Sequence, residues 1–125
     1  MEFPADLRYS PDHLWVRESN ENEVVVGITD FAQDQLGQII YVELPEVGDG
    51  VEAGIEMGTL ESAKSVSEVI SPVNGEVVRI NESLEDEPAI INQDPYGKGW
   101  MAVLKIQAEE LDELLSLEQY KEEIS

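Results

Sequence analysis

The sequence contains no cysteine and only one histidine, His13. Without cysteine the chain cannot form disulfides, thiolate metal sites or a cysteine nucleophile. A single histidine provides no histidine cluster for zinc and no obvious catalytic triad. We therefore expect neither catalytic residues nor metal ligands in this chain.

Basic residues are also scarce, because 7 lysines and arginines stand against 28 aspartates and glutamates, for a formal net charge of -21. Such a surface repels phosphate backbones and anionic lipids, so we expect no nucleic-acid or membrane partner. No apolar run approaches the roughly 18 residues of a membrane span. The first six residues lack the pattern of a targeting peptide, which favours a cytoplasmic location, or a mitochondrial one only if a transit peptide has been removed.

The apolar residues, 42% of the chain, occur in short β-branched and aromatic runs separated by turn residues. These runs predict strands within residues 14–16, 24–28, 39–44, 77–80 and 101–106. Many short strands between turns are typical of a mainly β sandwich or barrel. The length of 125 residues favours one domain spanning 1–125, with its core at about 7–107.

Two segments have helical patterns instead. The segment 29–36 begins with the capping residue Thr29 and stops at Gly37, which predicts a two-turn helix. In the segment at about 108–124 the apolar stripe changes phase near Ser116, which can form a capping box with Gln119. We expect two short helices with a bend there, packed on the β core. An acidic disordered extension is the alternative.

Lys64 stands out among the four lysines of the chain. It lies between two strand-like segments, and its neighbours Ala63 and Ser65 are small. A lysine in this position at a hairpin tip is open to a modifying enzyme. From these local features alone, an ordinary solvated turn lysine is the simpler interpretation.

The segment Glu61-Ser62-Ala63-Lys64-Ser65 resembles the lipoylation motif of the glycine cleavage system H-protein family, usually Glu-Ser-Val-Lys-Ala. Further similar blocks follow in the family's order over nearly the whole chain, at residues 9–16, 26–33, 36–37, 41–45, 71–77, 87–92 and 94–100. Biotin carriers with the same fold have methionine on both sides of their lysine. Ala63 and Ser65 therefore argue against biotin.

The resemblance implies a barrel-sandwich hybrid of two antiparallel sheets, in which Lys64 carries (R)-lipoate in amide linkage. It implies a monomeric, non-enzymatic carrier that moves an aminomethyl group from the pyridoxal-phosphate-dependent glycine decarboxylase (P protein) to the tetrahydrofolate-dependent aminomethyltransferase (T protein). Dihydrolipoamide dehydrogenase (L protein) would reoxidise the arm. A lipoate ligase or octanoyl transferase would attach it. Glu61 and Glu68 flank the lysine and either guide such enzymes or maintain solubility.

Members of the family hold the loaded arm in a surface cleft, where acidic and hydroxyl groups contact its cationic amine. One of these groups is usually a glutamate at the position where this chain has Leu14. We therefore expect Asp12 and Glu68 to hold the amine, with Asp12 on the same side of an extended strand as residue 14. His13 is either a cleft residue or, as we favour, a hydrogen-bonding histidine beside Trp15.

Leu14 keeps a second function open, that of an H-like lipoyl donor or redox-related carrier with an altered cleft. An enzyme is disfavoured because we find no nucleophile, metal set or phosphate loop. An acidic binding module without a cofactor is a further alternative. Intact mass after treatment with a lipoate ligase separates a carrier from such a module.

Overall fold

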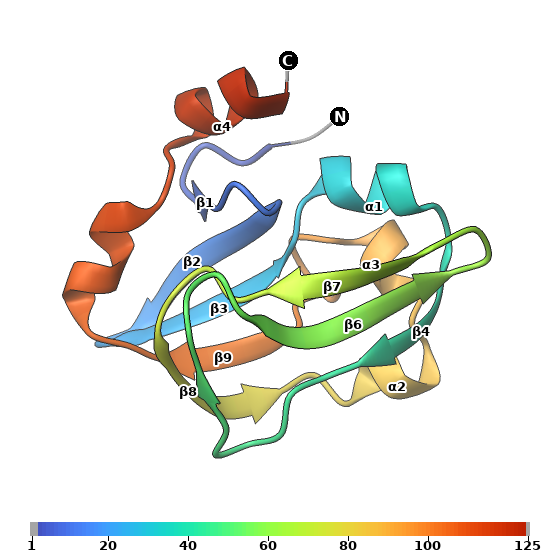
Figure 1. Ribbon diagram of the computed structural model, residues 1–125, viewed down its shortest axis with the longest axis horizontal. Helices are drawn as coiled ribbons and strands as arrows, with labels where there is room; N and C mark the ends of the chain where they lie inside the picture. Colours follow the sequence, from blue (N-terminus) through green and yellow to red (C-terminus); the bar gives the residue numbers. More distant parts are fainter. Residues whose placement is uncertain (1–2, 125) are drawn as a thin grey trace.

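The computed structural model describes residues 3–124, which form two antiparallel sheets flanked by short helices (Figure 1). The larger sheet has the strand order β1-β2-β3-β9-β8-β5, and the smaller has the order β4-β6-β7. The strands are β1 (Arg8–Tyr9), β2 (Leu14–Asn20), β3 (Glu23–Ile28), β4 (Ile39–Glu43), β5 (Gly50–Val51), β6 (Glu56–Ser62), β7 (Val66–Ile70), β8 (Gly75–Ile80) and β9 (Ala102–Lys105). The helices are α1 (Asp30–Leu36), α2 (Ser83–Asp86), α3 (Ile90–Gln93), the 3₁₀ helix η1 (Ala108–Glu113) and α4 (Leu117–Ile124).

The main hydrophobic core contains side chains from both sheets. Val24, Val26 and Ile28 occupy every second position of β3, so they share one face of the strand, and all three are buried in this core. Leu60 and Val69, from the smaller sheet, belong to the same buried cluster. Because full burial of such a side chain is worth about 1.5–3 kcal/mol, this shared core holds the two sheets together.

The predicted strands and the predicted helix at 29–36 are confirmed. In α1, Thr29 Oγ1 accepts a hydrogen bond from the Ala32 amide at the start of the helix, and the Gly37 amide donates to the Gln33 carbonyl at its end. Four elements, β1, β5, α2 and α3, were not predicted from the sequence. These are elements of two to four residues, too short for a periodic pattern.

The C-terminal segment is ordered and packed, as expected, and is not a disordered extension. Its bend falls at Ser116, whose amide donates to Gln119 Oε1 at 2.9 Å while its Oγ accepts from the Gln119 amide at 3.3 Å. The first of its two helices, η1, is 3₁₀ in type. Tyr9 and Leu115 exchange backbone hydrogen bonds, which joins the segment to β1 (Figure 1).

Across residues 3–124, none of the helices combines the length and the apolar character needed to cross a membrane.

Candidate functional site

Lys64 lies at the tip of the β6–β7 hairpin, which projects at the edge of the molecule (Figure 1). The antiparallel register pairs Leu60 with Ser67 and Glu61 with Val66, so the two strands are paired up to the turn. Residues 63–65 form the turn and are exposed. The hairpin therefore presents the lysine side chain to solvent on a paired, ordered base.

Ser62 fixes the backbone of this turn from below. Its side chain is only 8% exposed, and its Oγ accepts hydrogen bonds from the amides of Lys64 at 3.3 Å and Ser65 at 3.2 Å. The Ser62 amide donates to the Ser65 carbonyl at 2.8 Å. The backbone that carries Lys64 is thus held in one conformation while the side chain remains accessible.

The stem of Lys64 lies against Gly37 at the C-terminal end of α1. A Cβ atom placed on Gly37 would lie 3.1 Å from Lys64 Cε and 3.7 Å from Lys64 Nζ. Gly37 also has a φ of +83°, a conformation that other residues rarely adopt. Glycine is therefore favoured here both by its backbone and by the space that the lysine stem occupies.

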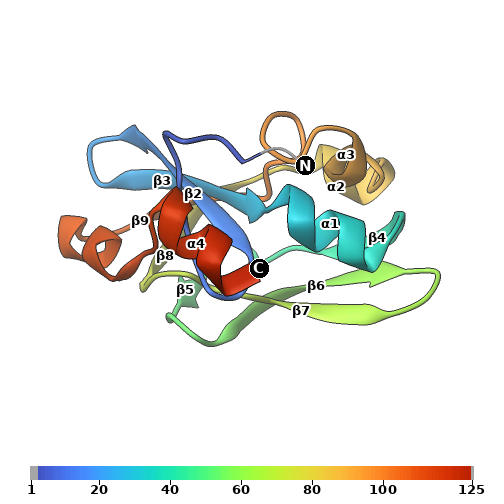
Figure 2. The ribbon, with the colours of Figure 1, turned by 90° about the horizontal axis from the view of Figure 1, so that it is seen from above.

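Two cavities lie on either side of α1. Figure 2 shows α1 between the β6–β7 hairpin and α3. The first cavity, which we call the α1–β7 cleft, has a volume of about 260 Å³. It is lined by Asp12, His13, Leu14, Ile28, Phe31, Ala32, Gln35, Leu36, Leu60, Ser67, Glu68 and Val69. Its lining is mainly apolar, and the exposed carboxylates of Asp12 and Glu68 provide its acidic groups.

The structure brings Asp12, His13 and Glu68 together in this cleft, but the expected extended conformation of residues 12–14 is wrong. The Ser10 carbonyl accepts from the His13 amide at 3.1 Å, and Ser10 Oγ accepts from the Leu14 amide at 3.1 Å. These bonds close a turn in which His13 has a φ of +70°, and β2 begins only at Leu14. Asp12 therefore lines the cleft from a turn and not from a strand.

His13 connects the cleft to α4. Its Nδ1 lies 2.9 Å from the Tyr120 hydroxyl, which lies 2.7 Å from Thr29 Oγ1. Burial lowers the pKa of His13 from its ordinary value of 6.5, and the carboxylates of Asp12 and Glu123 oppose this effect. This role of Tyr120 was not predicted, because no local sequence pattern pairs residues 107 positions apart.

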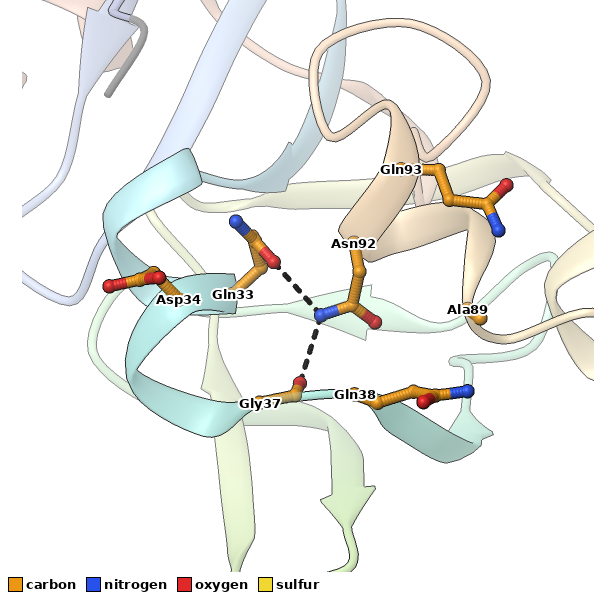
Figure 3. Close-up of a pocket in the computed structure, with 7 residues that line it drawn as sticks. All are labelled: Gln33, Asp34, Gly37, Gln38, Ala89, Asn92 and Gln93. Carbon is orange, nitrogen blue, oxygen red and sulfur yellow. Dashed lines mark hydrogen bonds between the residues drawn. The ribbon is translucent and has the colours of Figure 1, made fainter.

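The second cavity, which we call the amide pocket, lies between α1 and α3 and has a volume of about 360 Å³ (Figure 3). It is lined by Gln33, Asp34, Gly37, Gln38, Ala89, Asn92 and Gln93. Asn92 Nδ2 donates to Gln33 Oε1 and to the Gly37 carbonyl, both at 2.9 Å, and Asn92 Oδ1 accepts from the Ile39 amide at 2.8 Å. This pocket was not predicted from the sequence.

Two facing antiparallel sheets with an exposed lysine at a hairpin tip define a barrel-sandwich hybrid of the lipoyl-domain class. The family model "Glycine cleavage H-protein" matches residues 7–125. The chain therefore belongs to the glycine cleavage H-protein family, which consists of lipoyl carriers of the glycine cleavage system.

Individual relatives are similar to this chain over almost their full length. The glycine cleavage system H protein of Marinobacter nauticus is 51% identical, over 99% of this chain and 96% of that protein. The H protein of Coprothermobacter proteolyticus is 52% identical, over 98% of this chain and 97% of that protein. A crystal structure of the H protein from Mycobacterium marinum matches with a TM-score of 0.89 and 38% identity, over 98% of both chains.

The turn below Lys64 provides a first prediction. Ser62→Ala removes the acceptor of two turn amides, and the loss of such hydrogen bonds costs about 1 kcal/mol. We expect kcat/KM for acylation of Lys64 by a lipoate ligase to fall about fivefold. Ser65→Ala is the matched control, because the Ser65 side chain makes no hydrogen bond to the Ser62 side chain. Equal rates for the two variants would contradict the role given to Ser62.

His13 provides a second prediction. Because its folded-state pKa is lowered, the unfolded chain takes up the proton first as the pH falls. The stability that His13 contributes is therefore complete above its ordinary pKa of 6.5 and is lost as the pH falls through the lower folded-state value. His13→Asn retains a residue that tolerates positive φ.

Urea unfolding of the wild type and His13→Asn at a series of pH values measures this difference. We expect the advantage of the wild type to shrink as the pH is lowered from about 7.5 through 6.5 and below. Subtracting the two curves cancels the titration of the many surface carboxylates that both proteins share. A constant difference over this range would show that His13 does not titrate differently in the folded and unfolded states.

Proposed function

We propose that Lys64 carries (R)-lipoate in amide linkage and that this chain shuttles the aminomethyl group of glycine. The donor would be glycine decarboxylase (P protein) and the acceptor aminomethyltransferase (T protein), with dihydrolipoamide dehydrogenase (L protein) restoring the disulfide. The observation that carries the proposal is the exposed Lys64 on a turn whose backbone Ser62 holds. The lipoyl group supplies the two redox-active sulfurs, which a chain without cysteine cannot provide.

The surroundings of Lys64 fit an acyl arm. The amine is on an exposed tip, and Gly37 leaves free the space through which the stem passes. Acylation removes one positive charge and changes the formal net charge from -21 to -22, a small change for this surface. Glu61 and Glu68 near the tip support recognition by a lipoate ligase or octanoyl transferase with a basic cleft.

The α1–β7 cleft is suited to shield a loaded arm from water. Phe31, Leu36 and Leu60 contribute apolar side chains to its walls. Asp12 and Glu68 supply carboxylates that would pair with a cationic amine. A lowered pKa keeps the His13 imidazole neutral at pH 7, so it adds no charge that would repel the amine.

One observation favours a second candidate function, that of an H-like lipoyl donor or redox-related carrier. Leu14 is 1% exposed and belongs to the hydrophobic core, so its position offers no carboxylate to the cleft. Lys64 and the hairpin would serve such a protein equally well. Reconstitution with glycine decarboxylase and aminomethyltransferase separates the two functions. The relatives named above are bacterial proteins, which supports a cytoplasmic location, and we propose a monomer.

The attachment site is tested by intact mass. After incubation with a lipoate ligase, lipoic acid and ATP, we expect the wild type to gain one lipoyl increment and Lys64→Arg to gain none. Lys105→Arg is the control, because Lys105 is an exposed lysine on β9. Its mass should increase like that of the wild type. A lipoyl increment on Lys64→Arg, or an unmodified wild type, would contradict the proposal.

The role of the two carboxylates of the α1–β7 cleft, Asp12 and Glu68, is tested by the stability of the loaded arm. In lipoylated protein carrying aminomethyl groups, we expect Asp12→Asn and Glu68→Gln each to release ammonia to water about fivefold faster. This is the effect of losing an interaction of about 1 kcal/mol with a cation at a partly exposed site. Glu43→Gln is the control, because Glu43 is exposed on β4 and does not line the cleft. An unchanged rate of ammonia release in both Asp12→Asn and Glu68→Gln would exclude Asp12 and Glu68 as the groups that hold the amine.

A further inference from the structure

We propose that the amide pocket is a second binding site of this chain, and that its ligand is the unloaded, neutral acyl arm on Lys64. This inference rests on the proposed acylation of Lys64. The α1–β7 cleft would hold the arm when it carries a cation, and the amide pocket would hold it otherwise. Helix α1 forms a wall of both cavities and separates them.

The position of the lysine stem is the first observation. Lys64 Cε and Nζ lie over Gly37, and Gly37 lines the amide pocket but not the α1–β7 cleft. A group attached to Nζ therefore starts at the edge of the amide pocket. Because Gly37 has no side chain, nothing at that position blocks the way.

The chemistry of the lining is the second observation. Four carboxamide side chains surround the pocket, those of Gln33, Gln38, Asn92 and Gln93 (Figure 3). Asn92 is fully engaged with Gln33, Gly37 and Ile39, which makes it a fixed part of the wall. Gln38 and Gln93 are exposed and form no side-chain hydrogen bond with other residues in the range 3–124.

Acylation gives Nζ the hydrogen-bonding groups that such a lining can satisfy. It converts an ammonium, which only donates, into a secondary amide with one N–H donor and one C=O acceptor. A carboxamide offers both an acceptor and donors, so Gln38 and Gln93 complement this amide. Ala89 and the methylene groups of the glutamines provide contacts for an alkyl chain.

The size of the pocket and the tether make the site effective without high intrinsic affinity. A cavity of about 360 Å³ falls in the range of small-molecule sites, about 300–1,000 Å³. The arm is attached beside the pocket, so its effective concentration there is of millimolar order. A cationic adduct would shift the arm to the other side of α1, because the carboxylates of Asp12 and Glu68 favour the charged form.

The absence of cysteine allows a direct test of where the arm rests. A single cysteine is introduced in the amide pocket (Ala89→Cys), in the α1–β7 cleft (Ala32→Cys), or on the exposed strand β4 outside both (Tyr41→Cys). Tyr41 is paired with Glu61, close to the hairpin tip, so its cysteine is also near the arm.

Each lipoylated variant is kept with its arm oxidised and unloaded. The cysteine thiolate attacks one sulfur of the cyclic disulfide, forming a mixed disulfide and releasing the other sulfur as a thiolate, so no external oxidant is needed. Iodoacetamide added at timed intervals alkylates the released thiolate and prevents the ring from closing again. Peptide mapping then measures the link between Lys64 and the introduced cysteine.

We expect the link to Ala89→Cys to form at least tenfold faster than the links to Tyr41→Cys and Ala32→Cys. Adding Gln38→Leu and Gln93→Leu should slow the Ala89→Cys link severalfold without slowing the Tyr41→Cys link. Equal rates for Ala89→Cys and Tyr41→Cys would show a freely moving arm and overturn this inference alone. A faster link to Ala32→Cys would also overturn it, whereas failure of Lys64 to be acylated would remove the proposed function as well.

Discussion

The site depends on how α1 is fixed at both ends by side chains from distant parts of the chain. At its start, Thr29 Oγ1 caps the helix and also bonds the hydroxyl of Tyr120 from α4. At its end, the Asn92 side chain from α3 donates to the Gly37 carbonyl. A helix of seven residues is not stable alone in water, so these tertiary contacts keep it in place. Because α1 forms a wall of both cavities and supports the Lys64 stem, its position determines their geometry.

The hairpin tip combines a hydrogen-bonded backbone with an exposed side chain. Ser62 and the paired strands restrict the turn, while the Lys64 side chain is exposed to solvent. A carrier must present one atom to several enzymes in turn, which favours this combination. Under the proposed function, the restricted turn would give each enzyme the same backbone to recognise, and the exposed side chain would let the attached group reach different active sites. A tethered arm would also need only weak contacts to occupy the cavities beside α1.

Much of this architecture is predictable from sequence because it is encoded locally. Thr29 with Gly37, and Ser116 with Gln119, mark helix boundaries within a few residues, and the order of the family blocks points to Lys64 as the attachment site that we propose. The conformation at Asp12 was not predictable, because an extended segment and the turn closed by Ser10 have the same spacing in sequence. The amide pocket and the Tyr120 contacts depend on chain segments that meet only in the folded structure.

Leu14 stands where the family usually has a glutamate, and this difference changes which carboxylates the cleft can offer. A carboxylate buried at this position would need partners to offset its desolvation, but would hold a cation strongly in a medium of low polarity. Leu14 instead adds to the core, and the carboxylates that line the cleft, Asp12 and Glu68, are exposed. Exposed carboxylates remain hydrated, so folding costs little desolvation energy at these positions. The same water screens their attraction for an amine. If this chain holds a cationic arm as we propose, its retention would therefore depend more on the apolar walls that exclude water than on any single ion pair.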